Sequence, residues 1–235
     1  MRLDKRVTAL GLTRTQAKKM IAQGAVSVNG CVEKDPGAAV KDTDDVRVQG
    51  AKATVRGHVH YMVHKPKGVL TATRDGREKT VVDLIDSPPR DLGPIGRLDK
   101  DVTGLVLLTT DGQLAHRLIS PRFEVGKLYR AHVEGALDES AVQAFAAGIP
   151  LKDFTARPAK LTLEGESCAL VEVCEGKYHQ VKRMFQAIGH PVVELERLRI
   201  SDVWLDKNLA PGEYRELTEE ETALLYEAAG MKQEN

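Results

Sequence analysis

The stretch of sequence that decides the fold is Gly96-Arg97-Leu98-Asp99-Lys100-Asp101-Val102-Thr103-Gly104-Leu105-Val106-Leu107-Leu108-Thr109-Thr110-Asp111-Gly112. An acidic residue, Asp99, stands in a tight turn between a basic side chain and an apolar run. The continuous run from Leu105 to Leu108 predicts a strand covered on both faces. The pair Asp111-Gly112 predicts a turn after that strand. A carboxylate on such a rigid edge can be held in one orientation, as a nucleophile requires.

Length and composition limit the classes of protein that this chain can be. Its 235 residues suffice for one or two domains, and 42% apolar and 29% charged residues are ordinary for a globular protein. The charged start, residues 1–6, is unlike a secretory signal, and no apolar run reaches the length that spans a bilayer. Three cysteines without paired spacing indicate a reducing compartment. We therefore expect a cytoplasmic protein without membrane contact.

Charge is unevenly distributed along this chain, although its net charge is zero. Residues 1–30 contain six basic side chains against one acidic side chain, whereas residues 194–235 contain eleven acidic against five basic. This asymmetry indicates that a polyanion binds locally, at one face of the protein. The basic residues concerned are Arg2, Lys5, Arg6, Arg14, Lys18 and Lys19.

The first segment has the pattern of a small α/β module. Thr13 is expected to cap a helix that continues to Gln23 and that Gly24 terminates. Short strands at 26–28, 31–32 and 45–48 follow, the first two joined by a hairpin turn. Residues 49–57 contain few large apolar side chains and are typical of a linker. The expected domains are 1–56 and 57–235.

The second segment alternates short strands with helices. Strands are expected at 60–64, 106–109, 128–133, 169–173 and 213–217, and helices at 139–147, 180–188 and 219–229. This order predicts an α+β domain with a mixed, largely antiparallel sheet.

Four ordered segments resemble the pseudouridine synthases that modify ribosomal RNA and carry an N-terminal S4-like domain. The segments are Lys65-Pro66-Lys67-Gly68-Val69, the stretch 96–112, Lys127-Leu128-Tyr129, and Glu175-Gly176-Lys177-Tyr178-His179-Gln180-Val181-Lys182-Arg183-Met184-Phe185. Residues 2–5 and 24–30 are similar to both ends of the S4 RNA-binding module. The resemblance covers essentially the whole chain, and implies a small S4-like domain followed by a pseudouridine synthase catalytic domain.

The resemblance also implies a reaction. Making pseudouridine breaks an N-glycosidic bond, turns the base over and forms a carbon–carbon bond at C5, so no cofactor is chemically required. The target nucleotide must leave its stack. Asp99 would act as the nucleophile, and Tyr129 would stack on the flipped base and reach the C5 proton.

An ionised, buried carboxylate needs a cation beside it. Lys182 stands where related enzymes usually carry an arginine that pairs with the catalytic aspartate, and lysine gives a point charge in place of a planar fork. The sequence leaves open whether Lys182 or Arg183 is the partner of Asp99; we expect Lys182 to be this catalytic partner.

Other residues are expected to contact the substrate. Arg97 is close enough to Asp99 to fill the gap left by an extruded uridine, and Leu195 matches an apolar wall. The full set is Arg97, His179, Gln180, Arg183 and Leu195. The seven histidines show no ligand spacing, so we expect no metal.

The expected substrate is one uridine of 16S rRNA, conventionally position 516, either in free RNA or in an assembling small ribosomal subunit, modified by a monomer. Large-subunit (23S) enzymes share the catalytic motifs and are an alternative target class. A non-catalytic rRNA-binding assembly factor is another alternative. The pattern Asp99-x-Asp101-x-Thr103 also fits aspartyl phosphatases, but their motif follows an apolar strand, whereas this one precedes it.

Overall fold

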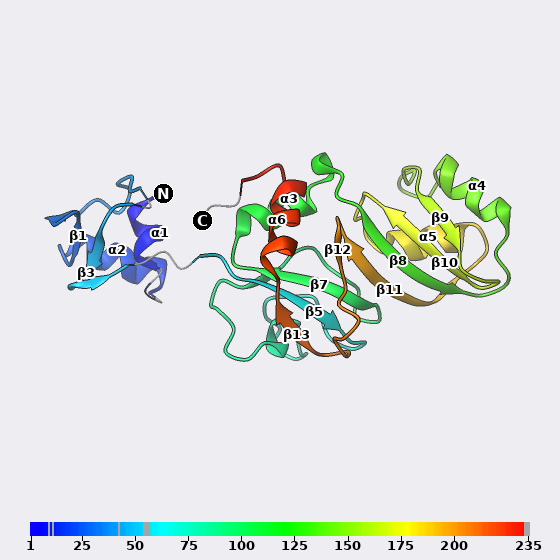
Figure 1. Ribbon diagram of the computed structural model, residues 1–235, viewed down its shortest axis with the longest axis horizontal. Coiled ribbons are helices and arrows are strands. Elements are labelled where there is room, and N and C mark those ends of the chain that lie inside the picture. The colour runs from blue at the N-terminus through cyan, green and yellow to red at the C-terminus, as the bar shows by residue number, and fades with distance from the viewer. Residues whose placement is uncertain (9, 11, 42, 54–56, 233–235) are drawn as a thin grey trace. The chain divides into compact units, whose positions relative to one another are not determined.

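The computed structural model describes residues 1–8, 10, 12–41, 43–53 and 57–232 (Figure 1). The chain forms two compact units, Met1–Gly57 and His58–Asn235. Residue 56, where the expected domain boundary fell, lies outside the described residues. Among the helices of the described part, none is long and apolar enough to cross a membrane.

The first unit packs two helices against a small sheet. The Thr13 hydroxyl accepts a hydrogen bond from the Gln16 backbone N–H, and the Gln16 side-chain oxygen accepts one from the Thr13 backbone N–H, which starts the second helix as expected. Gly24 follows the end of this helix with φ +75°. The sheet has the order β2-β1-β3-β4. The elements are α1 (Leu3–Thr8), α2 (Arg14–Ala22), β1 (Val26–Val28), β2 (Cys31–Val32), β3 (Val46–Val48) and β4 (Ala51–Lys52).

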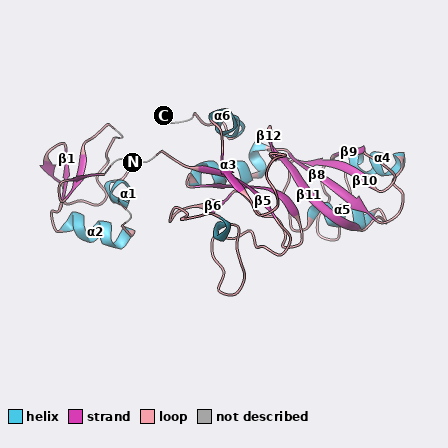
Figure 2. Ribbon diagram, turned by 60° about the horizontal axis from the view of Figure 1, so that its bottom comes forward, coloured by secondary structure: helices cyan, strands magenta, loops and turns pink. Residues whose placement is uncertain are grey.

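The second unit is built on one long sheet of order β13-β5-β7-β11-β8-β10-β9, with β6 beside β7 and β12 beside β11 (Figures 1 and 2). Every pairing is antiparallel except that of β7 with β11, so the predicted α+β class with a largely antiparallel sheet is confirmed. The strands are β5 (His60–Lys65), β6 (Gly93–Pro94), β7 (Thr103–Thr109), β8 (Lys127–Val133), β9 (Lys160–Leu163), β10 (Cys168–Val173), β11 (Val192–Ile200), β12 (Val203–Trp204) and β13 (Tyr214–Glu216).

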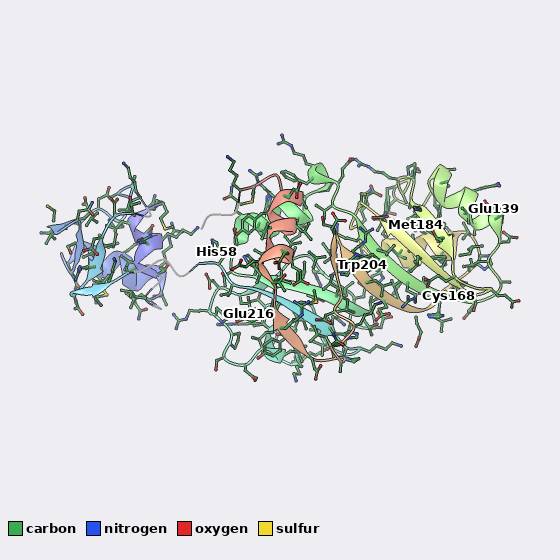
Figure 3. All side chains as sticks on the ribbon, viewed as in Figure 1. His58, Glu139, Cys168, Met184, Trp204 and Glu216 are labelled. Atoms are coloured by element: carbon green, nitrogen blue, oxygen red, sulfur yellow. The ribbon has the colours of Figure 1, made fainter. Side chains whose placement is uncertain are left out.

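Helices cover both faces of this sheet. Leu105 and Leu107 pack in one core with α3 and α6, whereas Val106 and Leu108 pack in a second core with α4 and α5. The four leucine and valine side chains are fully buried, which confirms the prediction of a strand covered on both faces. Figure 3 labels Met184 of α5, which belongs to the second of these cores. The helices are α3 (Gly112–Ile119), α4 (Glu139–Ala147), α5 (Gln180–Ala187) and α6 (Glu219–Ala228), with short 3₁₀ turns at Val82–Leu84 and Pro121–Phe123.

Asp111 starts a helix, so the prediction of a simple turn at Asp111-Gly112 was wrong. Its Oδ1 atom accepts hydrogen bonds from the backbone N–H groups of Gln113 (2.9 Å) and Leu114 (3.0 Å). Its Oδ2 atom accepts one from the Tyr226 hydroxyl of α6 (2.8 Å). Aspartate favours both turns and helix N-caps through the same acceptor geometry, so the dipeptide alone did not distinguish them.

Gly104 allows β7 to approach β11 closely. It has φ +102°, and a Cβ atom at this position would lie 2.3 Å from the carbonyl oxygen of Arg197 and 2.6 Å from its backbone nitrogen. Because Arg197 also stands opposite Tyr129 of β8, this contact sets the distance between three adjacent strands.

We predict that Gly104→Ala destabilises the protein by about 3 kcal/mol or more, because the added methyl group meets backbone atoms and the positive φ strains an L residue. The matched control is Gly112→Ala, since a Cβ atom there meets nothing within 4 Å. Chemical denaturation of the two variants measures the difference. Equal stability of the two variants would contradict the proposed steric role of Gly104.

Candidate active site

Asp99 lies in the turn between β6 and β7, and this turn is fixed on several sides. The Val102 N–H donates to the Asp99 carbonyl oxygen (3.1 Å), which closes the turn. The Thr71 hydroxyl donates to the Leu98 carbonyl oxygen (2.8 Å) and accepts from the Leu98 N–H (3.1 Å). The residue before Asp99 is therefore held by both of its backbone polar groups.

Lys65, at the end of β5, fixes the other side of this turn. Its side chain is completely buried, and its Nζ atom donates to the carbonyl oxygens of Val102 (2.7 Å), Pro66 (3.0 Å) and Lys100 (3.2 Å). Burial lowers the pKa of this ammonium group from 10.5 to about 8. Lys65 belongs to a motif that is visible in the sequence, but its contacts with this turn are not.

Two side chains from the start of α5 approach the Asp99 carboxylate. The Nε2 atom of His179 lies 3.4 Å from Asp99 Oδ1, and the Nζ atom of Lys182 lies 3.4 Å from Asp99 Oδ2. The Asp99 side chain is 30% exposed, so it is reached from solvent without being fully hydrated. This arrangement brings together residues that are about eighty positions apart in the sequence.

The Lys182 ammonium group lies near two carboxylates, those of Asp99 and Asp101. Its Nζ atom donates to both oxygens of Asp101, at 2.7 and 2.9 Å, which is closer than its approach to Asp99. The hydrogen bond from Lys182 lowers the pKa of the exposed Asp101 carboxyl. Arg183 forms its ion pair with Asp153 and donates to the Tyr178 carbonyl oxygen. In the described structure, Lys182 and not Arg183 is therefore the cation near Asp99.

A pocket opens in front of Asp99. Its floor is apolar and belongs to the core beneath α4 and α5, and its rim is polar. Four of the five expected substrate-binding residues line it, and Arg183 does not. The lining consists of Arg97, Leu98, Asp99, Val102, Tyr129, Val173, Glu175, Gly176, Lys177, His179, Gln180, Val181, Lys182 and Leu195.

Tyr129, on β8, forms part of the pocket wall and is mostly buried. Its hydroxyl accepts a 3.5 Å hydrogen bond from Nη1 of Arg197, a side chain that is only 2% exposed. The Nε atom of Arg197 donates to the Leu105 carbonyl oxygen (2.8 Å), and its Nη2 atom has no hydrogen-bond partner among the described residues. Sequence reasoning did not single out Arg197, because a basic residue in a strand usually faces solvent.

Gln180 organises the start of α5. Its Nε2 atom donates to Glu175 Oε2 (2.9 Å), and its Oε1 atom accepts from the Lys177 N–H (3.1 Å). His179, just before the helix, has the left-handed φ of 49° that side-chain-bearing residues rarely adopt. Such local strain often accompanies a functional segment.

The basic residues of the first unit have two different environments. Arg2 and Arg14 both donate to the buried Asp4 carboxylate at 3.2 Å while remaining largely exposed. Arg6 is buried and donates to the Asp44 carbonyl oxygen, so it contributes to the fold of this unit and not to its surface. The exposed members of the expected set are Arg2, Lys5, Arg14, Lys18 and Lys19. No candidate metal-binding group of three or more His, Cys, Asp or Glu side chains occurs in the described part of the chain.

Comparison with known families agrees with both units. Residues 59–187 match the model of the RNA pseudouridylate synthase family, and residues 1–46 match the S4 domain. The fold, the S4 unit and the pocket around Asp99 thus define an RNA-modifying isomerase. The chain belongs to the RNA pseudouridylate synthase family.

Similar proteins match this chain over nearly their whole length. An uncharacterised RNA pseudouridine synthase of Bacillus subtilis is 43% identical, over 97% of this chain and 99% of that protein. The ribosomal small subunit pseudouridine synthase A of Vibrio cholerae is 42% identical, over 96% of this chain and 100% of that protein. A crystal structure of a pseudouridylate synthase superimposes with a TM-score of 0.69 at 39% identity, covering 96% of this chain and 99% of that one.

The low pKa of Lys65 predicts a specific pH dependence of stability. Because the unfolded chain binds this proton more tightly than the folded protein does, the free energy of unfolding gains a contribution as pH rises from about 8 to 10.5. Lys65→Met should remove this contribution, which amounts to at most about 3 kcal/mol. Urea denaturation at several pH values in this range compares the two proteins. If the free energy of unfolding changed with pH in the same way for Lys65→Met and the original protein, the proposed burial of a charged Lys65 would be contradicted.

Proposed function

We propose that this protein isomerises one uridine of 16S rRNA, conventionally position 516, to pseudouridine, with Asp99 as the nucleophile. One observation carries the mechanism: the Asp99 carboxylate lies between Lys182 and His179 and lines the same pocket as Tyr129. The small-subunit target is supported by the relative from Vibrio cholerae, which is named for activity on the small ribosomal subunit.

The reaction rearranges one nucleotide, so no second substrate has to donate or accept a group or electrons. The target uridine leaves its stack and enters the pocket. The Asp99 carboxylate attacks C1′ of the ribose as the N1–C1′ bond breaks, and the uracil stays in the pocket and turns. The C5–C1′ bond then forms as Asp99 departs. The Tyr129 hydroxyl oxygen accepts the C5 proton while its own proton leaves to solvent, and N1 takes one proton from solvent, so the protons balance. The product has the same composition as the substrate.

Two polar side chains lie beside the Asp99 carboxylate. Lys182 supplies a positive charge at 3.4 Å, and His179 adds a second polar contact at the same distance. In a pocket with an apolar floor these contacts offset the cost of removing a carboxylate from water. Lys182 also remains hydrogen-bonded to Asp101, which fixes the ammonium group in place before the substrate arrives.

Other pocket residues have distinct roles in this proposal. Arg97 is exposed at the rim, where its guanidinium could occupy the space that the extruded nucleotide leaves and contact phosphate. Leu195 is buried and offers an apolar wall to the uracil. Gln180 holds the loop before α5 through Glu175 and Lys177. Arg183 supports the same loop from outside the pocket.

The S4 unit is proposed to bind the rRNA or the assembling small subunit through its exposed basic residues. Lys18 and Lys19 lie on α2, and Arg2, Lys5 and Arg14 lie on or beside its two helices. Phosphate contacts from such residues supply affinity without sequence preference. The pocket of the catalytic unit then selects the nucleotide.

We predict that Asp99→Asn abolishes pseudouridine formation and leaves the fold and most RNA affinity intact, because the amide keeps the shape but cannot act as an anionic nucleophile. Asp101→Asn is the matched control: it neutralises the other carboxylate bound to Lys182 but keeps an oxygen acceptor for the ammonium group, so it should retain activity within a few-fold. The amount of pseudouridine formed in a 16S transcript measures the activity of both variants. Near-normal turnover by Asp99→Asn would remove Asp99 from the mechanism.

Tyr129→Phe separates stacking from proton transfer. Phenylalanine keeps the aromatic face but lacks the hydroxyl proposed to take the C5 proton, so RNA binding should stay within a few-fold while pseudouridine yield falls strongly. An enzyme-bound uridine adduct should accumulate. A 5-fluorouridine substrate, which has no C5 proton, should be processed about equally by the variant and the original protein. An equal defect on 5-fluorouridine would show that Tyr129 acts before deprotonation.

Mapping pseudouridine in the rRNA of a strain that lacks this protein tests the target. We expect a single uridine of 16S rRNA to lose its modification. Loss of a 23S site instead would support the large-subunit alternative. Unchanged modification together with a ribosome assembly defect, equally rescued by the Asp99→Asn gene, would support the assembly-factor alternative.

A further inference from the structure

Tyr178 is an exposed aromatic residue whose ring the proposed mechanism does not use. Its side chain is 76% exposed, more than any other large apolar or aromatic side chain of the described residues. Exposing an aromatic ring forgoes the stabilisation that its burial would bring. The position of Tyr178 beside the pocket suggests that a ligand covers it.

The ring of Tyr178 is held in one orientation. It stacks on the ring of His179, with centroids 3.7 Å apart and planes inclined by 19°. The carbonyl oxygen of Tyr178 accepts a hydrogen bond from Arg183, which is itself paired with Asp153. One face of the Tyr178 ring is therefore occupied by His179, and the high exposure of the side chain leaves the rest of the ring to solvent.

Tyr178 lies next to the pocket but outside it. Its chain neighbours Lys177 and His179 both line the pocket, whereas Tyr178 does not. A base stacked on Tyr178 would consequently be one that flanks the target uridine, and not the uridine that enters the pocket.

The surroundings of Tyr178 suit a nucleotide. The Lys177 ammonium lies 3.7 Å from the centroid of the Phe154 ring, and the Arg183 guanidinium lies 5.1 Å from the same centroid. Lys177 precedes Tyr178 in the chain, and Arg183 donates to the Tyr178 carbonyl oxygen, so both cations lie near the exposed ring. Lys177 also lies 3.7 Å from Glu175 and Arg183 pairs with Asp153, and a phosphate would compete with these carboxylates. Proteins that bind single-stranded nucleic acid combine this same pair of features, an aromatic face and a cationic border.

We propose that Tyr178 is a stacking platform for the nucleotide adjacent to the target uridine, and that it thereby helps to select the substrate. This inference rests on the proposed function, because it assumes that the pocket receives a uridine from RNA. Stacking on Tyr178 would hold the flanking base on the enzyme while the target is extruded, so the backbone on either side of the uridine would be fixed.

Tryptophan fluorescence tests the contact directly. The chain has one tryptophan, Trp204, which lies on β12, is 54% exposed and contacts Arg199 (Figure 3). The double variant Tyr178→Trp, Trp204→Phe moves this reporter to the platform, and the original protein is the matched control. Saturating 16S rRNA should quench the emission of the indole at position 178. Saturated binding, followed by anisotropy, with no change in that emission would overturn the proposal.

This measurement separates the platform from the isomerase reaction. Quenching reports contact with RNA whether or not a uridine is converted. A quenched indole at position 178 in an enzyme that forms no pseudouridine would count against the proposed function and would leave only the contact of residue 178 with RNA supported.

Abasic substitution identifies the base that stacks. In 16S rRNA carrying a single abasic nucleotide on either side of the target uridine, one of the two sites should weaken binding to the original protein about 5- to 100-fold. The same site should not weaken binding to Tyr178→Ala, whereas Tyr178→Phe should behave like the original protein. Equal sensitivity of Tyr178→Ala and the original protein at both sites would overturn the proposal.

The effect of Tyr178→Ala on kinetics excludes a purely structural role. A platform predicts a raised KM with an unchanged kcat at saturating RNA. A lowered kcat at unchanged KM would show that Tyr178 acts only by holding His179 against Asp99, and it too would overturn the proposal.

Discussion

The structure depends on keeping one carboxylate in a fixed position at the edge of an apolar sheet. A turn of a few residues is too short to hold itself rigid, so the turn around Asp99 relies on donors from elsewhere. The buried ammonium of Lys65 supplies two of them, to the carbonyl oxygens of Lys100 and Val102, and its third hydrogen bond goes to the Pro66 carbonyl oxygen. A buried cation is costly unless its hydrogen bonds are satisfied. Here the carbonyl groups of the turn provide that satisfaction, so the lysine and the turn stabilise each other.

The sheet brings the other half of the site to this turn. β11 lies between β7, which follows Asp99, and β8, which carries Tyr129. Arg197 of β11 is opposite Gly104 on one side and opposite Tyr129 on the other. The only parallel pairing among the described strands of the catalytic unit is thus also the place where the two halves of the pocket meet. The spacing between Asp99 and Tyr129 is a property of the backbone and not of flexible side chains.

Much of the fold could be predicted from the sequence, because most strands and helices have clear hydrophobic periods and caps. The helix at 139–147 was predicted with the bounds that the structure shows. The six-residue α1 was not predicted, since it is too short to show a helical period and is stabilised by packing of Leu3 and Val7. The pocket residues on α5 and in the turn before β7 lie in recognisable motifs. The contacts of Lys65 and Arg197 could not be predicted, because they depend on which strands become neighbours.

The two faces of β7 belong to different cores. Substitutions that affect stability alone and substitutions that affect the pocket can therefore lie on opposite sides of the sheet. Leu107 packs with α3 and α6, whereas its chain neighbour Leu108 packs in the core that also forms the pocket floor. Residues without shared partners contribute almost independently to stability. The side of the sheet that carries α6 can therefore accumulate substitutions that alter heat resistance, while substrate geometry on the opposite side is conserved. Adaptation to temperature and adaptation to substrate can thus proceed on opposite faces of a single strand.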